Sequence, residues 1–213
     1  MLLKDKLQNY RLILASASPR RRELLAACDL DFTLAEKFEC EECYPADLAA
    51  DKVAEYLSQL KSEAYPHALG ENDILLTADT VVILGDKILG KPRSEEEAIE
   101  MISSLSGATH KVVTGVTLRT AQRSVSFSAE SLVTFRALED EEIAYYVERY
   151  RPLDKAGAYG IQEWIGYTAI ERIEGSFYNV MGLPVQRLYV ELQSLLKNHQ
   201  SLISHKVVPT KRD

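Results

Sequence analysis

The 213-residue chain has few cysteines, no long apolar run and no excess of positive charge. Three cysteines, an odd and low number, argue against a disulfide scaffold. No apolar run approaches the roughly 20 residues of a membrane span, so we expect no contact with a membrane. A net charge of −7 argues against coating DNA, which needs a basic surface, so no nucleic-acid partner is expected. A small anion can still bind at a local basic pocket.

The remaining composition is that of an ordinary globular protein, with 46% hydrophobic and 27% charged residues. Residues 1–10 lack the apolar core of a signal peptide, so the cytoplasm is the expected location. No internal repeat or low-complexity linker divides the chain. We therefore predict one domain over residues 1–198, followed by a loose polar tail at 199–213.

Hydrophobic periodicity predicts strands and helices that alternate, with a strand-rich middle. The expected strands are 12–14, 31–38, 74–84, 87–89, 112–119, 125–135 and 167–173. The expected helices are 19–27, 47–65, 94–105, 139–150 and 184–196. This order indicates an α/β or α+β domain built around a mixed sheet.

The helix predicted at 19–27 carries positive charge at its N-terminal end, where the helix dipole disfavours it. Ser18 is in the N-cap position and Pro19 in the favoured first helical position. Arg20, Arg21 and Arg22 then fill the first turn, where each cation costs about 0.3–1 kcal/mol against the helix dipole. A bound phosphate would compensate these charges. The alternative is that the arginines splay into solvent.

Three charged residues lie where a phosphate and a cation site would need them. Asp79 interrupts the apolar run 74–84, and a buried charge is costly unless it is paired or bound to metal. It is a candidate for metal-assisted hydrolysis, or it lies at a bend where it reaches water. Lys91 follows a glycine and precedes a proline, which suits phosphate contact, although exposed loop lysines are common. Lys61, at the margin of an apolar stripe, can equally extend to solvent.

An acidic segment at residues 39–43 contains two further candidate sites. Glu39, Glu41 and Glu42 can supply a carboxylate to a divalent cation, or they form a solvated loop. Cys40 and Cys43 form a Cys-x-x-Cys pair without a second pair to complete a zinc site. We therefore favour incidental cysteines over a metal or redox role.

The segment 154–162 places glycines among ionic and amide groups, so its backbone can approach a ligand closely. Gln162 carries both donors and an acceptor, which suits contact with the edge of a base. The alternative is a tight loop with an amide facing solvent. The glycine pattern is not a dinucleotide-binding fingerprint, and the chain contains no Walker A motif.

Taken together, these segments resemble the Maf family of nucleoside triphosphate pyrophosphatases, over about residues 11–196. The motifs are Ser-Ala-Ser-Pro-Arg-Arg at 16–21, Ala-Asp-Thr-Val-Val at 78–82, Leu-Gly-Lys-Pro at 89–92, Thr-Gly-Val at 114–116, Asp-Lys-Ala-Gly-Ala-Tyr-Gly-Ile-Gln at 154–162 and Gly-Ser-Phe-Tyr-Asn-Val-Met-Gly-Leu-Pro at 175–184. The loop at 154–162 is similar to that of the branch acting on dTTP and UTP.

The resemblance implies an α/β, Maf/inosine triphosphatase-like fold, with a central mixed twisted sheet flanked by helices, a deep cleft and a homodimer. It implies Asp79 as the catalytic carboxylate, and Mg²⁺ or Mn²⁺ held near Glu42 and Asp79. The residues that it implies around the triphosphate are Ser16, Arg20, Arg21, Lys61 and Lys91. Those that it implies for base preference are Arg20, Thr80 and Gln162.

The expected reaction is hydrolysis of dTTP and UTP to the monophosphate and pyrophosphate, which would cleanse the nucleotide pool. Two alternatives stay open at this point. One is the branch of the same family that acts on 7-methyl-GTP, and the other is a non-enzymatic regulator of cell division.

Overall fold

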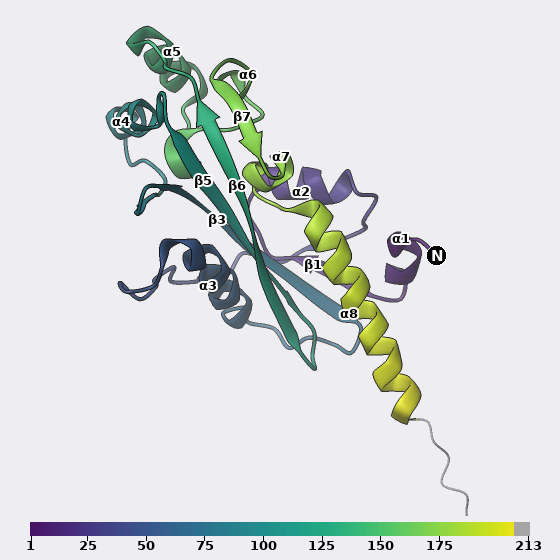
Figure 1. Cartoon of the computed structure of the whole chain (residues 1–213). Coiled ribbons are helices and arrows are strands. Elements are labelled where there is room, and N and C mark those ends of the chain that lie inside the picture. Colours follow the sequence, from purple (N-terminus) through teal and green to yellow (C-terminus); the bar gives the residue numbers. More distant parts are fainter. Residues whose placement is uncertain (207–213) are drawn as a thin grey trace, which may run out of the picture.

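The structure, a computed structural model, describes residues 1–206, with side chains described through residue 197. Seven strands in this range form one mixed sheet (Figure 1). In order across the sheet they are β2 (Thr33–Leu34), β1 (Arg11–Leu14), β3 (Asp73–Leu84), β5 (Thr109–Arg119), β6 (Ser124–Phe135) and β7 (Ile170–Glu174), with β4 (Lys87–Leu89) paired to the end of β3. β1 runs parallel to β2 and β3, and the other pairs are antiparallel. The predicted α/β class with a mixed sheet is confirmed.

Helices cover both faces of this sheet, and α3 and α8 lie on opposite sides of it (Figure 1). The helices are α1 (Leu3–Leu7), α2 (Pro19–Ala26), α3 (Ala50–Glu63), α4 (Glu95–Leu105), α5 (Asp140–Tyr150), the 3₁₀ turn η1 (Ala156–Ala158), α6 (Trp164–Thr168), α7 (Phe177–Met181) and α8 (Val185–Lys206). No helix among the described residues is long and apolar enough to cross a membrane.

The alternation of side chains along β3 divides the core into separate clusters. Ile74 and Leu76 pack with α2 and α8, whereas Val82, on the same face of β3, packs with α4 and α5. Between these two apolar groups the face is interrupted by Thr80, which is polar. The opposite face of β3 contributes Val81 to a third cluster, formed with α3. This polar break in the middle of a buried strand marks the position of the site.

One edge of β3 is open at its centre. β3 pairs with β1 as far as Leu76 and with β4 from Val82 onward, so no strand among the described residues pairs on that side with the residues between them. Asp79 and Thr80 lie in this gap, and both line the same cleft. Because the edge is open, side chains from the two faces of the sheet reach one common space.

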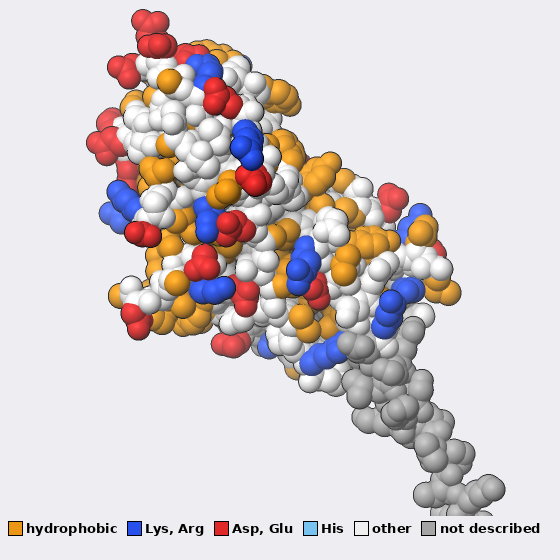
Figure 2. Space-filling model, viewed as in Figure 1, with side chains coloured by type: hydrophobic (Ala, Val, Ile, Leu, Met, Phe, Trp, Pro, Cys, Tyr) orange, Lys and Arg blue, Asp and Glu red, His pale blue; other side chains and the backbone are white. Residues whose placement is uncertain are grey.

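The first turns of three helices differ sharply in charge. α4 begins with Glu95–Glu97 and α5 with Asp140–Glu142, which favours the positive end of each helix dipole. Figure 2 shows acidic side chains gathered at the end of the molecule where these two helices lie. By contrast, α2 begins with Pro19 and three arginines and has no acidic residue in its first turn.

Most predicted elements are present, and several bounds need correction. The helix predicted at 47–65 is shorter, at Ala50–Glu63, and the strand predicted at 112–119 begins earlier, at Thr109. The predicted strand at 167–173 begins only at Ile170, because Tyr167 belongs to α6. Of the extended segment 31–38, only β2 is a strand. The final helix continues past Leu196 to Lys206, into the predicted tail at 199–213. Residues 207–213 of that tail lie outside the described residues, and a single domain over 1–198 stays a prediction.

Candidate active site

A cleft of about 560 Å³ opens at the gap in β3. It is lined by the start of α2, the segment after β2, the last turn of α3, the loop after β4, the segment 154–162 and the end of α7. Every site residue expected from the sequence lines this one cleft: Ser16, Arg20, Arg21, Glu42, Lys61, Asp79, Thr80, Lys91 and Gln162. Six separate segments of the chain therefore converge on one space.

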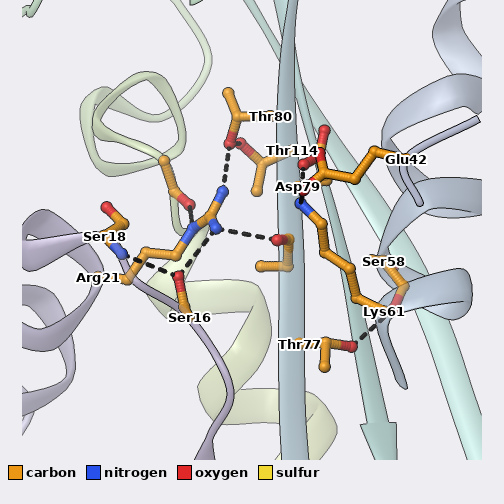
Figure 3. A network of polar contacts seen from close by, with 12 residues as sticks. Ser16, Ser18, Arg21, Glu42, Ser58, Lys61, Thr77, Asp79, Thr80 and Thr114 are labelled. Atoms are coloured by element: carbon orange, nitrogen blue, oxygen red, sulfur yellow. Dashed lines mark hydrogen bonds and ion pairs between the residues drawn. The ribbon is translucent and has the colours of Figure 1, made fainter. Parts of the chain in front are cut away.

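The Asp79 carboxylate is paired with a lysine from the neighbouring helix. Lys61 Nζ lies 2.5 Å from Asp79 Oδ1 and 3.1 Å from Glu42 Oε1 (Figure 3). The Lys61 and Asp79 side chains are only 17% and 14% exposed, whereas that of Glu42 is 50% exposed. The ammonium thus compensates two carboxylates at the floor of the cleft, and it does not extend into solvent.

A glycine allows α3 to lie close enough for this contact. Gly115 on β5 pairs with Asp79. A Cβ atom at Gly115 would lie 2.3 Å from the backbone C and O of Ala54, in α3. Because such a distance excludes any side chain, the helix can cross β5 at backbone contact. This crossing holds Lys61, two turns further along α3, over the sheet.

The two carboxylates have the chemistry of a divalent-cation site. Mg²⁺ bound to nucleotides is held by one or two protein carboxylates together with phosphate oxygens and water. Asp79 and Glu42 converge on a single positive group, the Lys61 ammonium. The described residues contain no cluster of three or more histidine, cysteine or acidic side chains. The site thus fits a cation completed by substrate oxygens, and it does not fit an all-protein metal cage.

Arg21 has its guanidinium occupied by the protein. Nε donates to the Gly182 carbonyl at 2.8 Å, and Nη1 donates to the Ala78 carbonyl at 2.9 Å. Nη1 and Nη2 also donate to the hydroxyls of Ser16 and Thr80, both at 3.1 Å (Figure 3). Burial lowers the pKa of this guanidinium from its usual value, an effect that the charge of Asp79 opposes. Arg21 therefore ties α2, β3 and the end of α7 together at the wall of the cleft.

The two hydroxyls that accept from Arg21 differ in whether they can still donate a hydrogen bond to a ligand. The Thr80 hydroxyl accepts from Arg21 and shares a hydrogen bond of 2.9 Å with Thr114, whose own hydrogen goes to the Asn179 carbonyl. Its single hydrogen therefore goes to Thr114, and it has no hydrogen left to donate to a ligand. The Ser16 hydroxyl accepts from Arg21 and from the Ser18 N–H, and its own hydrogen is free for a ligand oxygen.

Two further cations line the cleft and make fewer contacts with the protein than Lys61 and Arg21 do. Arg20 Nη1 lies 3.3 Å from Asp154 Oδ2, and the two side chains are 22% and 60% exposed. Lys91 is exposed and has no hydrogen bond or ion pair with the described residues. Both side chains can therefore turn toward a bound anion at little energetic cost.

The segment 154–162 contains two residues with positive φ. Gly157 has φ +68°, and a Cβ there would meet Val82 at 2.9 Å. Ala158 takes a positive φ of 59° although it carries a side chain. Gln162 follows, with its Oε1 buried and without a hydrogen-bond partner among the described residues. An orphaned acceptor in the wall of a cleft is an expected feature of a group that waits for a ligand.

Comparison with known proteins identifies the family of the chain. A family model described as "Maf-like protein" matches residues 11–195. The chain belongs to the Maf family. A protein named dTTP/UTP pyrophosphatase from Bacteroides thetaiotaomicron is 51% identical over 189 residues, which are 89% of this chain and 98% of the relative. One with the same name from Porphyromonas gingivalis is 55% identical over 191 residues, covering 89% and 96% of the two chains.

Among solved structures, "Nucleoside-triphosphatase / dITP/XTP pyrophosphatase from Mycobacterium abscessus" is similar to this Maf-family chain at 11% identity and a TM-score of 0.40. That match covers 93% of this chain and 100% of the other.

Several residues of this Maf-family site could not be chosen from the sequence. Lys155 is buried and contacts the carboxylates of Asp154 and Glu163 at 2.7 and 3.1 Å. Tyr146, on α5, is buried as well and reaches Glu163 from the core. A lysine beside an aspartate in a glycine-rich loop was the one available signal, and the tyrosine gave none.

The cysteine pair lies at the rim of the cleft in this Maf-family chain. Cys28, Cys40 and Cys43 are all free thiols, and Cys40 lines the cleft. Burial raises the pKa of the Cys40 thiol, and a hydrogen bond to Glu41 raises that of Cys43. Raised values disfavour the thiolate, which is the reactive and metal-binding form.

Proposed function

We propose that this cleft hydrolyses dTTP and UTP to the monophosphate and pyrophosphate. The observation that carries the proposal is the Asp79 carboxylate, held by Lys61 on the floor of a cleft whose rim bears Arg20 and Lys91. Relatives at 51% and 55% identity over almost their whole length are named dTTP/UTP pyrophosphatase. A set of cations facing paired carboxylates is what a triphosphate with a divalent cation requires.

The triphosphate would be bound mainly by groups that the protein leaves free. Lys91 and Arg20 supply mobile positive charge at the rim, and the Ser16 hydroxyl supplies a donor at the wall. Lys61 supplies an ammonium at the floor. Arg21 spends four of its five N–H donors on protein oxygens, so it shapes the wall and keeps one N–H for the ligand.

The carboxylates would hold Mg²⁺ or Mn²⁺, which neutralises charge on the phosphate oxygens when it is bound. Asp79 and Glu42, which share the Lys61 ammonium, would be its ligands. Asp79 would also orient a water molecule and accept its proton as the water oxygen bonds to the α-phosphorus. The bond between the α-phosphorus and the bridging oxygen breaks, and pyrophosphate leaves with that oxygen. Lys61 compensates the carboxylate before substrate arrives.

Base choice would depend on Gln162 more than on Thr80. The buried Gln162 Oε1 can accept from the N3–H of uracil or thymine, while its amide donates to a ring carbonyl. Cytosine presents an acceptor at N3, so it leaves this group unpaired, which disfavours binding. The Thr80 hydroxyl is already committed to Arg21 and Thr114, so its part is to fix the wall.

The test is pyrophosphate release from a nucleotide panel by the purified chain. We expect dTTP and UTP to be preferred over CTP, with purine triphosphates and 7-methyl-GTP poor. Asp79→Asn should abolish turnover while the fold persists, since it keeps the volume and removes the charge. Asp86→Asn, at the exposed β3–β4 turn, is the matched control and should be fully active. Preference for 7-methyl-GTP, or an active Asp79→Asn protein, would overturn the assignment.

A homodimer and a cytoplasmic location follow from the resemblance and the sequence, and both belong to the same proposal. Light scattering on the eluted protein tests the dimer, with the monomer mass of 23.9 kDa as reference.

A further inference from the structure

A buried network of polar side chains connects the core with the segment that contains Gln162. The Tyr146 hydroxyl donates to the Glu163 carboxylate and accepts from the Gly160 N–H at 3.0 Å. The other oxygen of Glu163 lies 3.1 Å from Lys155 Nζ. Gly160 and Glu163 lie on either side of Gln162 in the sequence. The network therefore fixes the backbone on both sides of Gln162, which lines the cleft.

Tyr146, Glu163 and Lys155 are linked to one another by a hydrogen bond and an ion pair. Tyr146 and Lys155 are 0% and 7% exposed, and a buried ammonium requires a paired carboxylate. Burial raises the pKa of the Tyr146 phenol, so the hydroxyl keeps its proton and donates it to Glu163. A buried polar network of this kind holds its members in one geometry, because a side chain that moves away leaves its buried partner without a hydrogen bond.

Glu163 also packs directly against the turn that presents Gln162. A Cβ at Gly160 would lie 2.9 Å from Glu163 Cδ and 3.1 Å from Gln162 Nε2. The glycine is therefore needed for the carboxylate to reach the tyrosine across the turn. The Nε2 of Gln162 takes part in the same contact, and its Oε1 is buried without a hydrogen-bond partner among the described residues, in a residue that lines the cleft.

We propose that Tyr146, Glu163 and Lys155 are positioning residues that aim the Gln162 amide at the edge of a uracil-type base. The inference rests on the proposed function, because it assigns selectivity within that same site. Tyr146 and Glu163 lie outside the lining of the cleft, and Lys155, which is part of that lining, is paired with the carboxylates of Asp154 and Glu163. They act by holding the 160–163 turn, so their loss should weaken recognition of the base more than the chemistry at the phosphate.

The test compares Tyr146→Phe with Tyr150→Phe, which removes the same hydroxyl from a ring stacked on Tyr146 with centroids 5.1 Å apart. The described residues supply no hydrogen-bond partner to the Tyr150 hydroxyl. Tyr146→Phe should lower the ratio of kcat/KM for dTTP to that for CTP by about tenfold, through KM for dTTP, with kcat within about twofold. Tyr150→Phe should leave the ratio unchanged.

A second readout does not depend on hydrolysis. Trp164, the single tryptophan of the chain, follows Glu163 directly, so its fluorescence reports on this turn. Titration with dTMP and with CMP should show binding of dTMP weakened by about tenfold in Tyr146→Phe, and binding of CMP unchanged.

Glu163→Gln keeps the shape of the side chain and removes its charge, so it carries the test if Tyr146→Phe does not fold. We expect the same loss of selectivity, and Glu163→Asp should restore part of it. Wild-type dTTP-to-CTP and dTMP-to-CMP ratios in Tyr146→Phe and Glu163→Gln would overturn the inference, whatever happens to their melting temperatures. A wild-type chain that releases no pyrophosphate from dTTP or UTP would instead overturn the proposed function, and the dTMP titration would still decide this inference.

Discussion

Asp79 and Thr80 are neighbours on β3, yet their side chains meet cations on opposite faces of the sheet. Lys61 Nζ lies 2.5 Å from Asp79 Oδ1, whereas the Thr80 hydroxyl accepts from Arg21 at 3.1 Å (Figure 3). The period of two along a strand produces this division. Lys61 therefore pairs with the carboxylate on one face and Arg21 holds the wall of the cleft on the other, and variants should separate these two roles.

Arg20 and Arg21 should behave differently when each is replaced by alanine. Arg21→Ala leaves the acceptors at Gly182 and Ala78 without partners, so we expect a loss of about 2–4 kcal/mol in the free energy of unfolding. Arg20→Ala breaks only an exposed pair with Asp154 and should cost less than about 1 kcal/mol.

The measurement is urea unfolding of both variants beside pyrophosphate release. Arg20→Ala should raise KM for the nucleotide without a change in stability. Equal stability of the two variants would contradict the structural duty assigned to Arg21.

The sequence predicts these arginines alike, because both violate the same dipole rule at the start of α2. The structure resolves most of that violation within the protein, since Arg21 is bonded to carbonyls that come from β3 and from the end of α7. Those partners lie far along the chain, and no local pattern announces them. The prediction that a phosphate compensates these charges stays a prediction, and the structure adds contacts of Arg21 with protein carbonyls that the sequence does not predict.

Elements with strong local signals were predictable. β3 is a long apolar run, β4 returns from a Gly-Asp turn, and the Ser94 side chain caps α4 by accepting from the Glu97 N–H. The short helices α1, α6 and α7 were missed. Helices of five residues are marginal by themselves and persist here through tertiary contacts.

Gly115→Ala should disrupt the site by displacing α3, the helix that carries Lys61. Its Cβ would lie 2.3 Å from backbone atoms of Ala54, so α3 must move and Lys61 must leave Asp79. We expect a loss of more than about 2 kcal/mol in the free energy of unfolding, and much lower turnover in whatever remains folded. Gly90→Ala is the control for stability, because a Cβ there meets nothing within 4 Å. Unchanged turnover in Gly115→Ala would show that the close crossing of α3 is not needed.

His110 should make the protein sensitive to acid. The ring is 1% exposed, its Nε2 is 2.8 Å from the Tyr159 hydroxyl, and burial lowers its pKa to about 4. Since the unfolded value is about 6.5, folding favours the neutral ring. Its contribution is complete above about pH 6.5 and is lost as pH falls toward 4, to a total of about 3 kcal/mol.

His110→Gln cannot take up that proton, so the variant should lose less stability than the wild type between pH 7 and pH 4.5. Urea unfolding at the two pH values measures the difference, with His67→Gln, an exposed histidine, as the control. The same pH dependence in His110→Gln and wild type would remove His110 from the acid response.

Gln162→Glu should change the choice of base without changing the fold. The carboxylate can still accept from N3–H, but it has no hydrogen to donate to the ring carbonyl of thymine or uracil, and it places a charge beside that oxygen. The exocyclic amine of cytosine, by contrast, can donate to it. We therefore expect kcat/KM for dTTP and UTP to fall by about 100-fold and that for CTP to fall much less. Gln122→Glu, in the β5–β6 turn and outside the cleft lining, adds the same charge and should leave every ratio as in the wild type. If both variants keep the wild-type order of dTTP, UTP and CTP, the buried Gln162 oxygen is not the group that reads the base.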